Sequence, residues 1–246
     1  MRALVDAASF LGRETLRIVL PASCAACGGE LPWRARSASC CRPCWSALRP
    51  LEGVRCRRCA AAWEGGPAGA SFLCLRCASI DDDAIERIDA WGAYRDGLER
   101  LLVAFKFRRH DFLDAPLAGL LAERWRAWSD GDFDAVVPVP MHPRKLRERG
   151  YNQAALLARR FARATKLTLY RDALRKTRET AAQSTLRREE RASNVRGAFT
   201  AADGLRGRRI LLIDDVCTTG ATLRACAKAL RRAGAARVAA LTVARA

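Results

Sequence analysis

The C-terminal part of the chain holds the pattern that restricts its fold most. Residues 209–213 suit a buried strand, residues 221–233 repeat apolar side chains at helical spacing up to Gly234, and residues 237–243 suit another strand. A strand, a helix and a strand at this spacing predict a βαβ unit, which implies a parallel sheet with helices on its faces. We therefore expect an α/β fold.

The preceding part of the chain continues this alternation of strands and helices. Apolar periodicity predicts strands at 85–94, 134–140 and 167–170, and helices at 98–107, 112–128 and 152–165. Lys106 lies on the polar side of the first of these helices, where we expect it to be solvated, with a phosphate contact as the alternative. The long polar segment 175–196 is expected to be a functional flap or disordered.

The loop that follows the strand at 209–213 carries the most specific chemistry. Ligands of open parallel sheets lie beyond the carboxyl ends of strands, and helix N-termini attract anions through their unpaired N–H groups and dipole. Asp214 and Asp215 suit the vicinal hydroxyls of a ribose, and residues 217–220 can wrap their amides around a phosphate, with Gly220 permitting close approach. The alternative is a plain turn with a threonine helix cap. A Walker loop is excluded because no Gly-Lys-Ser/Thr ending is present.

Cysteines divide the chain into parts. Nine of the eleven cysteines lie between Cys24 and Cys77, in a stretch with too few periodic apolar residues to build a core. Clustered CxxC pairs in a chain without a recognisable export signal favour metal over disulfides. We expect a lead-in helix at 1–22, a double CxxC zinc module at 23–80 and the α/β domain at 85–246.

The CxxC pairs form two tetrads, and each supplies the four thiolates that tetrahedral zinc prefers. Cys40 is an alternative to Cys41 as a ligand. A redox dithiol is the weaker alternative, because no thioredoxin-like βαβ unit surrounds the pairs. The expected ligands are Cys24, Cys27, Cys41 and Cys44 in one tetrad, and Cys56, Cys59, Cys74 and Cys77 in the other.

The net charge of +18 indicates a polyanionic partner, either nucleic acid or a phosphorylated small molecule, although an arginine-rich composition alone is the plain alternative. Aromatic residues such as Trp45 and Trp63 lie among basic ones in the zinc module, where they shield the metal or stack the bases of single-stranded DNA. No stretch approaches the roughly 20 apolar residues of a membrane span, and no signal peptide is recognisable, so a cytoplasmic location is expected.

The segment from Ile210 to Thr222 resembles the phosphoribosyl-pyrophosphate signature of type I phosphoribosyltransferases. The whole chain resembles the narrower competence protein F (ComF) family, which joins an N-terminal zinc module to such a domain. Residues 137–143, 147–153 and 194–199 carry that wider resemblance. It implies a type I phosphoribosyltransferase-like parallel sheet flanked by helices, with a small N-terminal zinc-ribbon domain of the four-cysteine type, and a link to DNA uptake and natural transformation.

The resemblance also implies a role for each part of the site. Asp214 and Asp215 would hold the ribose hydroxyls and carry the catalytic role beside magnesium. Pyrophosphate would be received by Pro140, Met141 and His142, and the polar segment would close as a flexible loop with Arg187, Arg188 and Arg191, a solvated linker being the alternative. The full set expected to bind phosphoribosyl pyrophosphate is Asp214, Asp215, Val216, Cys217, Thr218, Thr219, Gly220, Ala221 and Thr222.

Two functions of different classes follow. As an enzyme, the domain would transfer the ribose C1 of phosphoribosyl pyrophosphate to a nitrogen nucleophile, by positioning and by stabilising charge on the leaving group. As a non-catalytic module, it would keep the loop for a nucleotide and use its basic surface for single-stranded DNA. The sequence identifies no pocket for an acceptor base, so both functions stay open at this point.

Overall fold

The structure is a computed structural model that describes residues 23–31, 39–63, 65, 72–80, 84–107, 111–128, 132–180 and 194–246. The expected lead-in helix at 1–22 and the flexible-loop residues Arg187, Arg188 and Arg191 lie outside the described residues. Among the helices described, none combines the length and the apolar character that a membrane crossing requires.

The elements alternate along the chain much as the apolar periodicity predicts. The helices are α2 (Arg42–Ser46), α3 (Leu75–Ala78), α4 (Asp96–Phe107), α5 (Asp114–Arg126, preceded by a 3-10 turn at Asp111–Leu113), α6 (Pro143–Arg149), α7 (Gln153–Thr165) and α9 (Ala221–Arg232). The strands are β1 (Arg87–Ala93), β2 (Ala135–Pro138), β3 (Thr168–Leu169), β4 (Leu174–Lys176), β5 (Phe199–Ala201), β6 (Arg209–Cys217) and β7 (Arg237–Arg245).

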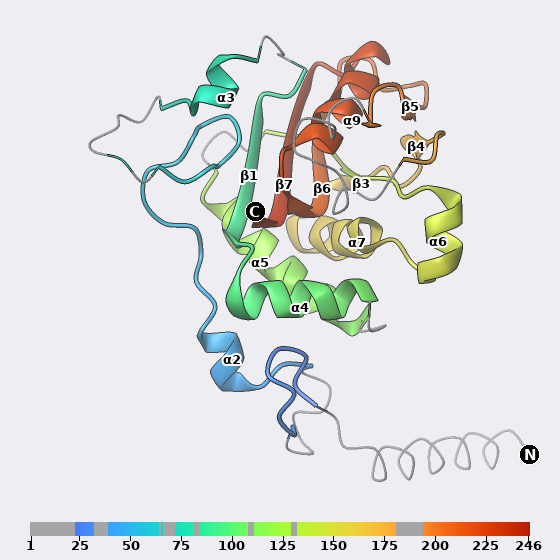
Figure 1. Ribbon diagram of the computed structural model, residues 1–246. Coiled ribbons are helices and arrows are strands. Elements are labelled where there is room, and N and C mark those ends of the chain that lie inside the picture. Colours follow the sequence, from blue (N-terminus) through green and yellow to red (C-terminus); the bar gives the residue numbers. More distant parts are fainter. Residues whose placement is uncertain are drawn as a thin grey trace, which may run out of the picture.

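Five parallel strands form the main sheet, in the order β1-β7-β6-β2-β3, which confirms the expected fold (Figure 1). Strand β6 pairs with β2 on one side and β7 on the other. Its residues 210–213 are completely buried, because helices cover both faces of the sheet. A strand buried on both faces has a continuous apolar sequence, which is why this one could be recognised.

Two layers of helices enclose the sheet. Helices α4, α5 and α7 cover one face, where Leu211 and Ile213 join their core. Helix α9 and the antiparallel β4–β5 ribbon cover the other face, where Ile210 and Leu212 are buried (Figure 1). The alternation of residues along β6 thus distributes its side chains between two separate cores.

The structure differs from the expected elements of this domain in three places. Strand β6 continues to Cys217, so Asp214 and Asp215 belong to the strand and not to the loop after it. The strands β4 and β5, at the two ends of the polar segment, were not expected; they pair with Leu174 and Phe199 buried against α9. Helix α6 was not expected either; it begins at Pro143, and proline suits the first position of a helix.

The cysteine-rich module lies along the edge of the sheet. In its middle, the backbone N–H of Leu51 donates to the carbonyl of Trp91 at 2.6 Å, and Pro50 forms an isolated bridge with Gly92. Further along, the carbonyl of Arg58 accepts from Ile88 N–H at 3.0 Å. Strand β1 is the edge strand, so these bonds satisfy groups that would otherwise offer an open edge for aggregation.

Candidate functional site

An open cavity of about 760 Å³ lies at the carboxyl ends of β2 and β6. These neighbouring strands lead in opposite directions: β2 continues through α7 to β3, and β6 continues through α9, on the other face, to β7. Such a switch point leaves a crevice in which ligands of parallel sheets bind. The cavity brings together three groups that the sequence analysis singled out, namely the carboxylates Asp214 and Asp215, most of the loop 217–222, and the turn 140–142.

The two carboxylates differ in their surroundings. Asp215 is buried, and its Oδ2 lies 3.1 Å from the Nζ of Lys106. Asp214 is half-buried, and its Oδ1 accepts the backbone N–H of Asp215 at 2.9 Å. Burial, and then the neighbouring charge of Asp215, raise the pKa of Asp214 to about 8. Asp214 therefore binds its proton more tightly than an ordinary carboxyl group, and Asp215 pairs with a cation at the edge of the cavity.

The expectation that Lys106 is solvated was wrong. Its side chain is 21% exposed and reaches Asp215 from the end of α4. Burial alone would lower the pKa of Lys106, but the carboxylates of Asp215 and Asp214 raise it above its ordinary value. The sequence placed this lysine on the polar side of an amphipathic helix, and it could not show that this side borders a cavity.

The loop between β6 and α9 has the backbone of an anion site. Gly220 has a φ of 75°, in the left-handed region, and is the N-terminal cap residue of α9. The Oγ1 of Thr219 accepts the backbone N–H of Ala221 at 3.3 Å, so one threonine caps the helix. Thr218, Gly220 and Thr222 line the cavity. The sequence suggested either a helix cap or an anion site, and one loop can thus both cap α9 and bind an anion.

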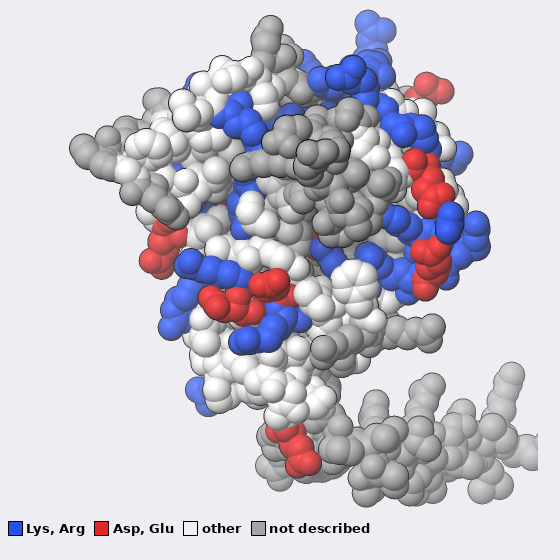
Figure 2. Space-filling view, in the orientation of Figure 1, with Lys and Arg blue, Asp and Glu red and all other residues white. Residues whose placement is uncertain are grey.

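Cations surround the cavity on three sides. Lys106 comes from α4, Lys145 and Arg149 from α6, and Lys176 from β4. Burial, and then the charge of Lys145, lower the pKa of Lys176. Figure 2 shows basic side chains over α9, and basic side chains mixed with acidic ones over α6. Lys145 was missed because α6 was not expected, and Arg149, although it lies in the segment 147–153 that carries the family resemblance, was given no role in the site.

The turn 140–142 follows β2 directly. The amide Nδ2 of Asn152 donates to the carbonyl of Val139 at 3.0 Å, and the Oδ1 of Asn152 accepts Ala154 N–H at 3.0 Å, so one side chain fixes the turn and the start of α7. The Nδ1 of His142 accepts the N–H of Arg144 at 3.4 Å and caps α6. Pro140, Met141 and His142 all line the cavity.

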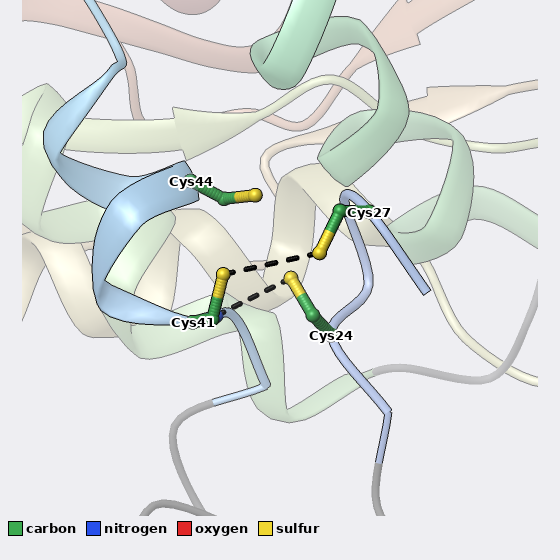
Figure 3. A group of neighbouring side chains, drawn as sticks. All are labelled: Cys24, Cys27, Cys41 and Cys44. Carbon is green, nitrogen blue, oxygen red and sulfur yellow. Dashed lines mark hydrogen bonds between the residues drawn. The ribbon is translucent and has the colours of Figure 1, made fainter. Parts of the chain in front are cut away.

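The first cysteine loop holds its thiols around a common centre. The side chains of Cys24, Cys27, Cys41 and Cys44 point toward one another (Figure 3), and their Sγ atoms all lie within 4.8 Å of each other. The Sγ atoms of Cys27 and Cys41 are 3.9 Å apart. Four thiolates at a Zn–S distance of about 2.3 Å are separated by roughly 3.8 Å, so the set fits tetrahedral zinc. The geometry favours Cys41 over Cys40 as the ligand.

The second cysteine loop has the same geometry. The Sγ atoms of Cys56, Cys59, Cys74 and Cys77 lie within 4.8 Å of one another, with Cys59 and Cys74 at 3.7 Å. This tetrad is more buried than the first, and Phe72 packs against it. Trp63 contacts Phe72, with ring centroids 4.6 Å apart and the rings tilted by 48°. Each set of four thiolates fits one zinc ion, in agreement with the spacing of the CxxC pairs.

Comparison with known families agrees with both halves of the chain. The phosphoribosyl transferase domain matches residues 111–246, and the double zinc ribbon domain matches residues 15–79. Among solved structures, the chain is similar to a glutamine phosphoribosylpyrophosphate amidotransferase from B. subtilis in complex with ADP and GMP, with 22% identity and a TM-score of 0.37, over 53% of this chain and 26% of that one.

Relatives of known sequence match over longer stretches. The chain is 32% identical to the DNA utilization protein YhgH of Escherichia coli K12, over 80% of this chain and 86% of that protein. It is 30% identical to the competence protein ComFC of Bacillus subtilis, over 79% of this chain and 78% of the relative. It is 33% identical to competence protein F of Haemophilus influenzae, over 58% of this chain and 66% of the relative.

Proposed function

The chain belongs to the ComF family, in which a double zinc ribbon precedes a phosphoribosyl transferase domain, and on that premise we propose that its cavity binds phosphoribosyl pyrophosphate with magnesium. One observation carries the proposal. Two carboxylates, a helix N-terminus with its threonine loop, and several cations line one cavity at the switch point of the sheet. This combination suits a ligand with ribose hydroxyls and two separate phosphate groups.

The assignment of ligand groups follows from the chemistry of each part. Asp214 and Asp215 accept hydrogen bonds from the vicinal ribose hydroxyls. The loop 218–222 receives the 5-phosphate through its amides and hydroxyls. The pyrophosphate lies toward the turn 140–142, near the ammonium groups of Lys106 and Lys145. This arrangement leaves the ribose C1 between the carboxylates and the leaving group.

Magnesium suits this set of donors. Hard cations prefer carboxylate and phosphate oxygens, and Asp214 and Asp215 are carboxylates beside the proposed phosphate positions. When bound, the ion would neutralise charge on the pyrophosphate. The chain's own contribution is to hold the sugar on its carboxylates and to place cations where negative charge develops as the C1–oxygen bond breaks. The nitrogen nucleophile that would accept the ribosyl group is not identified by any residue of the cavity.

Zinc is the second part of the proposal. We propose that each cysteine tetrad holds one zinc ion, because four converging thiolates in a chain segment with little core of its own need a metal to offset their chain entropy. Metal analysis of the purified protein should find about two zinc ions per chain. Protein that contains neither zinc nor iron would end this assignment.

The ligand assignment is tested by separating ribose from phosphate recognition. Exchanging both acids, Asp214→Asn and Asp215→Asn, keeps side-chain size but weakens acceptance from the hydroxyls. Hydrogen bonds to charged groups contribute about 1.5–3 kcal/mol each, so titration calorimetry should show a loss of ten-fold or more for phosphoribosyl pyrophosphate. Inorganic pyrophosphate should lose far less. Asp203→Asn, an exposed acid outside the cavity, is the matched control. Unchanged binding by the double variant refutes the assignment.

A second function, binding of single-stranded DNA, is favoured by a separate feature. A cleft of about 960 Å³ lies between the second cysteine loop and edge strand β1, and the described residues that line it include seven arginines and two acids. Guanidinium groups release counterions from nucleic-acid phosphates, which gives affinity that falls with salt. The arginines are Arg55, Arg57, Arg58, Arg87, Arg124, Arg231 and Arg237.

This second function has its own test. The logarithm of the DNA association constant, plotted against the logarithm of salt concentration, should slope downward by roughly 0.7 per phosphate contacted. Arg57→Ala should make the slope shallower by about one such contact. Binding that is absent at low salt, or that survives high salt unchanged, would refute DNA binding. Turnover of phosphoribosyl pyrophosphate with a panel of bases and amines separates an enzyme from a non-catalytic module.

A further inference from the structure

The second cysteine loop is hydrogen-bonded directly to the loop 217–222, which we call the phosphate loop. The guanidinium Nη2 of Arg76, which lies between Cys74 and Cys77 in α3, donates to the backbone carbonyl of Thr219 at 2.5 Å. The same carbonyl accepts from the Nη1 of Arg224 at 2.9 Å. Arg224 is itself buried, and its Nη2 lies 3.9 Å from the Sγ of Cys77. The carbonyl of Thr219 therefore accepts hydrogen bonds from two arginines. Arg76 lies inside the CxxC pair of Cys74 and Cys77, and Arg224 contacts Cys77.

A second bridge joins the same two regions at the other end of the loop. Arg245, at the end of β7, is buried; its Nε donates to the carbonyl of Cys59 at 2.9 Å and its Nη1 donates to the carbonyl of Cys217 at 3.1 Å. Cys59 belongs to the second tetrad, and Cys217 is the last residue of β6. The carbonyls at positions 217 and 219 are thus both fixed by guanidinium groups.

The geometry of the peptide bond shows how these hydrogen bonds orient the amide N–H groups of the loop. In a planar trans peptide, the C=O of one residue and the N–H of the next point in opposite directions. Holding the carbonyls of Cys217 and Thr219 toward the cysteine loop therefore directs the N–H groups of Thr218 and Gly220 to the other side. Thr218 and Gly220 line the cavity, and Thr219 is absent from the described residues that line it. The bonds thus set the orientation of two amide donors.

We infer that Arg76, Arg224 and Arg245 are positioning residues for the 5-phosphate, and that the metal held by Cys56, Cys59, Cys74 and Cys77 keeps two of their anchor points in place. The inference rests on the proposed function of the cavity. It makes the second metal centre a part of the phosphate site, whereas the first centre is a separate structural unit.

The first tetrad supports this distinction by its different location. It packs against the start of α4. A Cβ atom added at Gly97 would lie 3.3 Å from the side chain of Leu48 and 4.0 Å from the carbonyl oxygen of Cys44. Among the described residues, no hydrogen bond or ion pair joins the first tetrad to the loop 217–222. Metal in this tetrad therefore has no direct bond to the phosphate loop.

The test compares two arginines that donate to carbonyls at similar distances. Arg76→Ala removes the bond to Thr219. Arg49→Ala serves as the control. It removes hydrogen bonds to the carbonyls of Ser46 at 2.6 Å and Leu48 at 2.9 Å, which follow the first cysteine tetrad in the chain. Arg76→Ala should weaken ribose 5-phosphate binding by about ten-fold, while inorganic pyrophosphate changes less than about two-fold, and Arg76→Lys should recover part of the loss. A role in general stability would weaken both ligands alike.

Hydrogen exchange of the unliganded protein separates this inference from the proposed function. Arg76→Ala should speed exchange of the backbone amides at residues 217–222, and Arg49→Ala should leave them unchanged. If the parent protein binds neither ribose 5-phosphate nor phosphoribosyl pyrophosphate, the proposed function fails, and the exchange result still decides the positioning role. Unchanged exchange in Arg76→Ala, or equal losses for ribose 5-phosphate and pyrophosphate, would overturn the inference.

Discussion

The two cysteine tetrads have the same ligands and nearly the same geometry, but the chain around them docks at different places. The first lies against the helical layer that α4 forms, and the second lies against the end of β6 and the loop 217–222. A metal site in a small module stabilises whatever its knuckles contact. On the inferred positioning role of Arg76, the roles of the two tetrads differ because of the carbonyls and guanidinium groups around them, and not because of their ligand spacing.

The largest expected difference between the tetrads comes from removing ligands. The pair Cys74→Ser and Cys77→Ser should lose one metal ion and more than ten-fold of the affinity for ribose 5-phosphate, because Arg76 and Cys59 lose their fixed positions together. The matched pair Cys24→Ser and Cys27→Ser should also lose one metal ion but keep that affinity within about three-fold. Metal analysis and titration calorimetry on both variants give the result. Equal losses of affinity would erase the distinction between the tetrads.

A smaller effect is expected from a side chain placed inside the bonded loop. Gly220→Ala puts a Cβ 2.6 Å from the Nη1 of Arg224 and 3.0 Å from Ile88, at a φ of 75°. Gly204→Ala is the control, because its φ is 84° but its Cβ would meet nothing within 4 Å. Both should lose about 1 kcal/mol of unfolding free energy through backbone strain. Only Gly220→Ala should lose more than that, and should also weaken ribose 5-phosphate binding. Denaturant unfolding that ranks the two variants equally would contradict the tight contact with Arg224.

The last of these effects concerns pH and tests whether the carboxylate part of the candidate site is independent of the second cysteine loop. The pKa of Asp214 is raised from an ordinary value near 3.8 to about 8. Between these values the folded protein binds more protons than the unfolded chain, so the contribution of Asp214 to stability is full at acid pH and is lost as pH rises toward 8. Asp214→Asn should remove this decline, and Arg76→Ala should retain it.

Urea unfolding between pH 5 and pH 8.5 measures this profile. Asp214→Asn should be the more stable protein relative to the parent at the upper end of the range, although it binds phosphoribosyl pyrophosphate less well. Parallel pH profiles for the parent and Asp214→Asn would show that the neighbouring charge and burial do not act on this carboxyl. A changed profile in Arg76→Ala would show that the two halves of the site are coupled.

Local sequence patterns were enough to predict the main elements of the fold. The strands with continuous apolar sequence, the CxxC pairs and the longer helices could be predicted because each depends on residues close together in the chain. The extent of β6 could not, because Asp214 and Asp215 are polar residues inside a strand, where Asp214 continues the pairing with β7 at Thr242. In the sequence, polar residues at the end of a strand cannot be distinguished from the polar residues of a turn.

The bonds that join the two parts of the site had no local signal at all. Arg76 and Thr219 are 143 positions apart, and Arg245 and Cys59 are 186 positions apart. The chain contains many arginines, and nothing in their neighbours distinguishes these two from those on the surface. The position of Lys106 depends likewise on which layer covers the end of β6. Such contacts are determined by tertiary packing, so only the structure could identify them.

The most direct measurement is a crystal structure of the zinc-loaded protein with phosphoribosyl pyrophosphate and magnesium. We predict that the ribose hydroxyls lie on Asp214 and Asp215, that the 5-phosphate lies on the amides of Thr218 and Gly220, and that the hydrogen bond from Arg76 to Thr219 is retained. A ligand in the arginine-lined cleft beside β1, or a 5-phosphate on the turn 140–142 with the loop 218–222 empty, would contradict it.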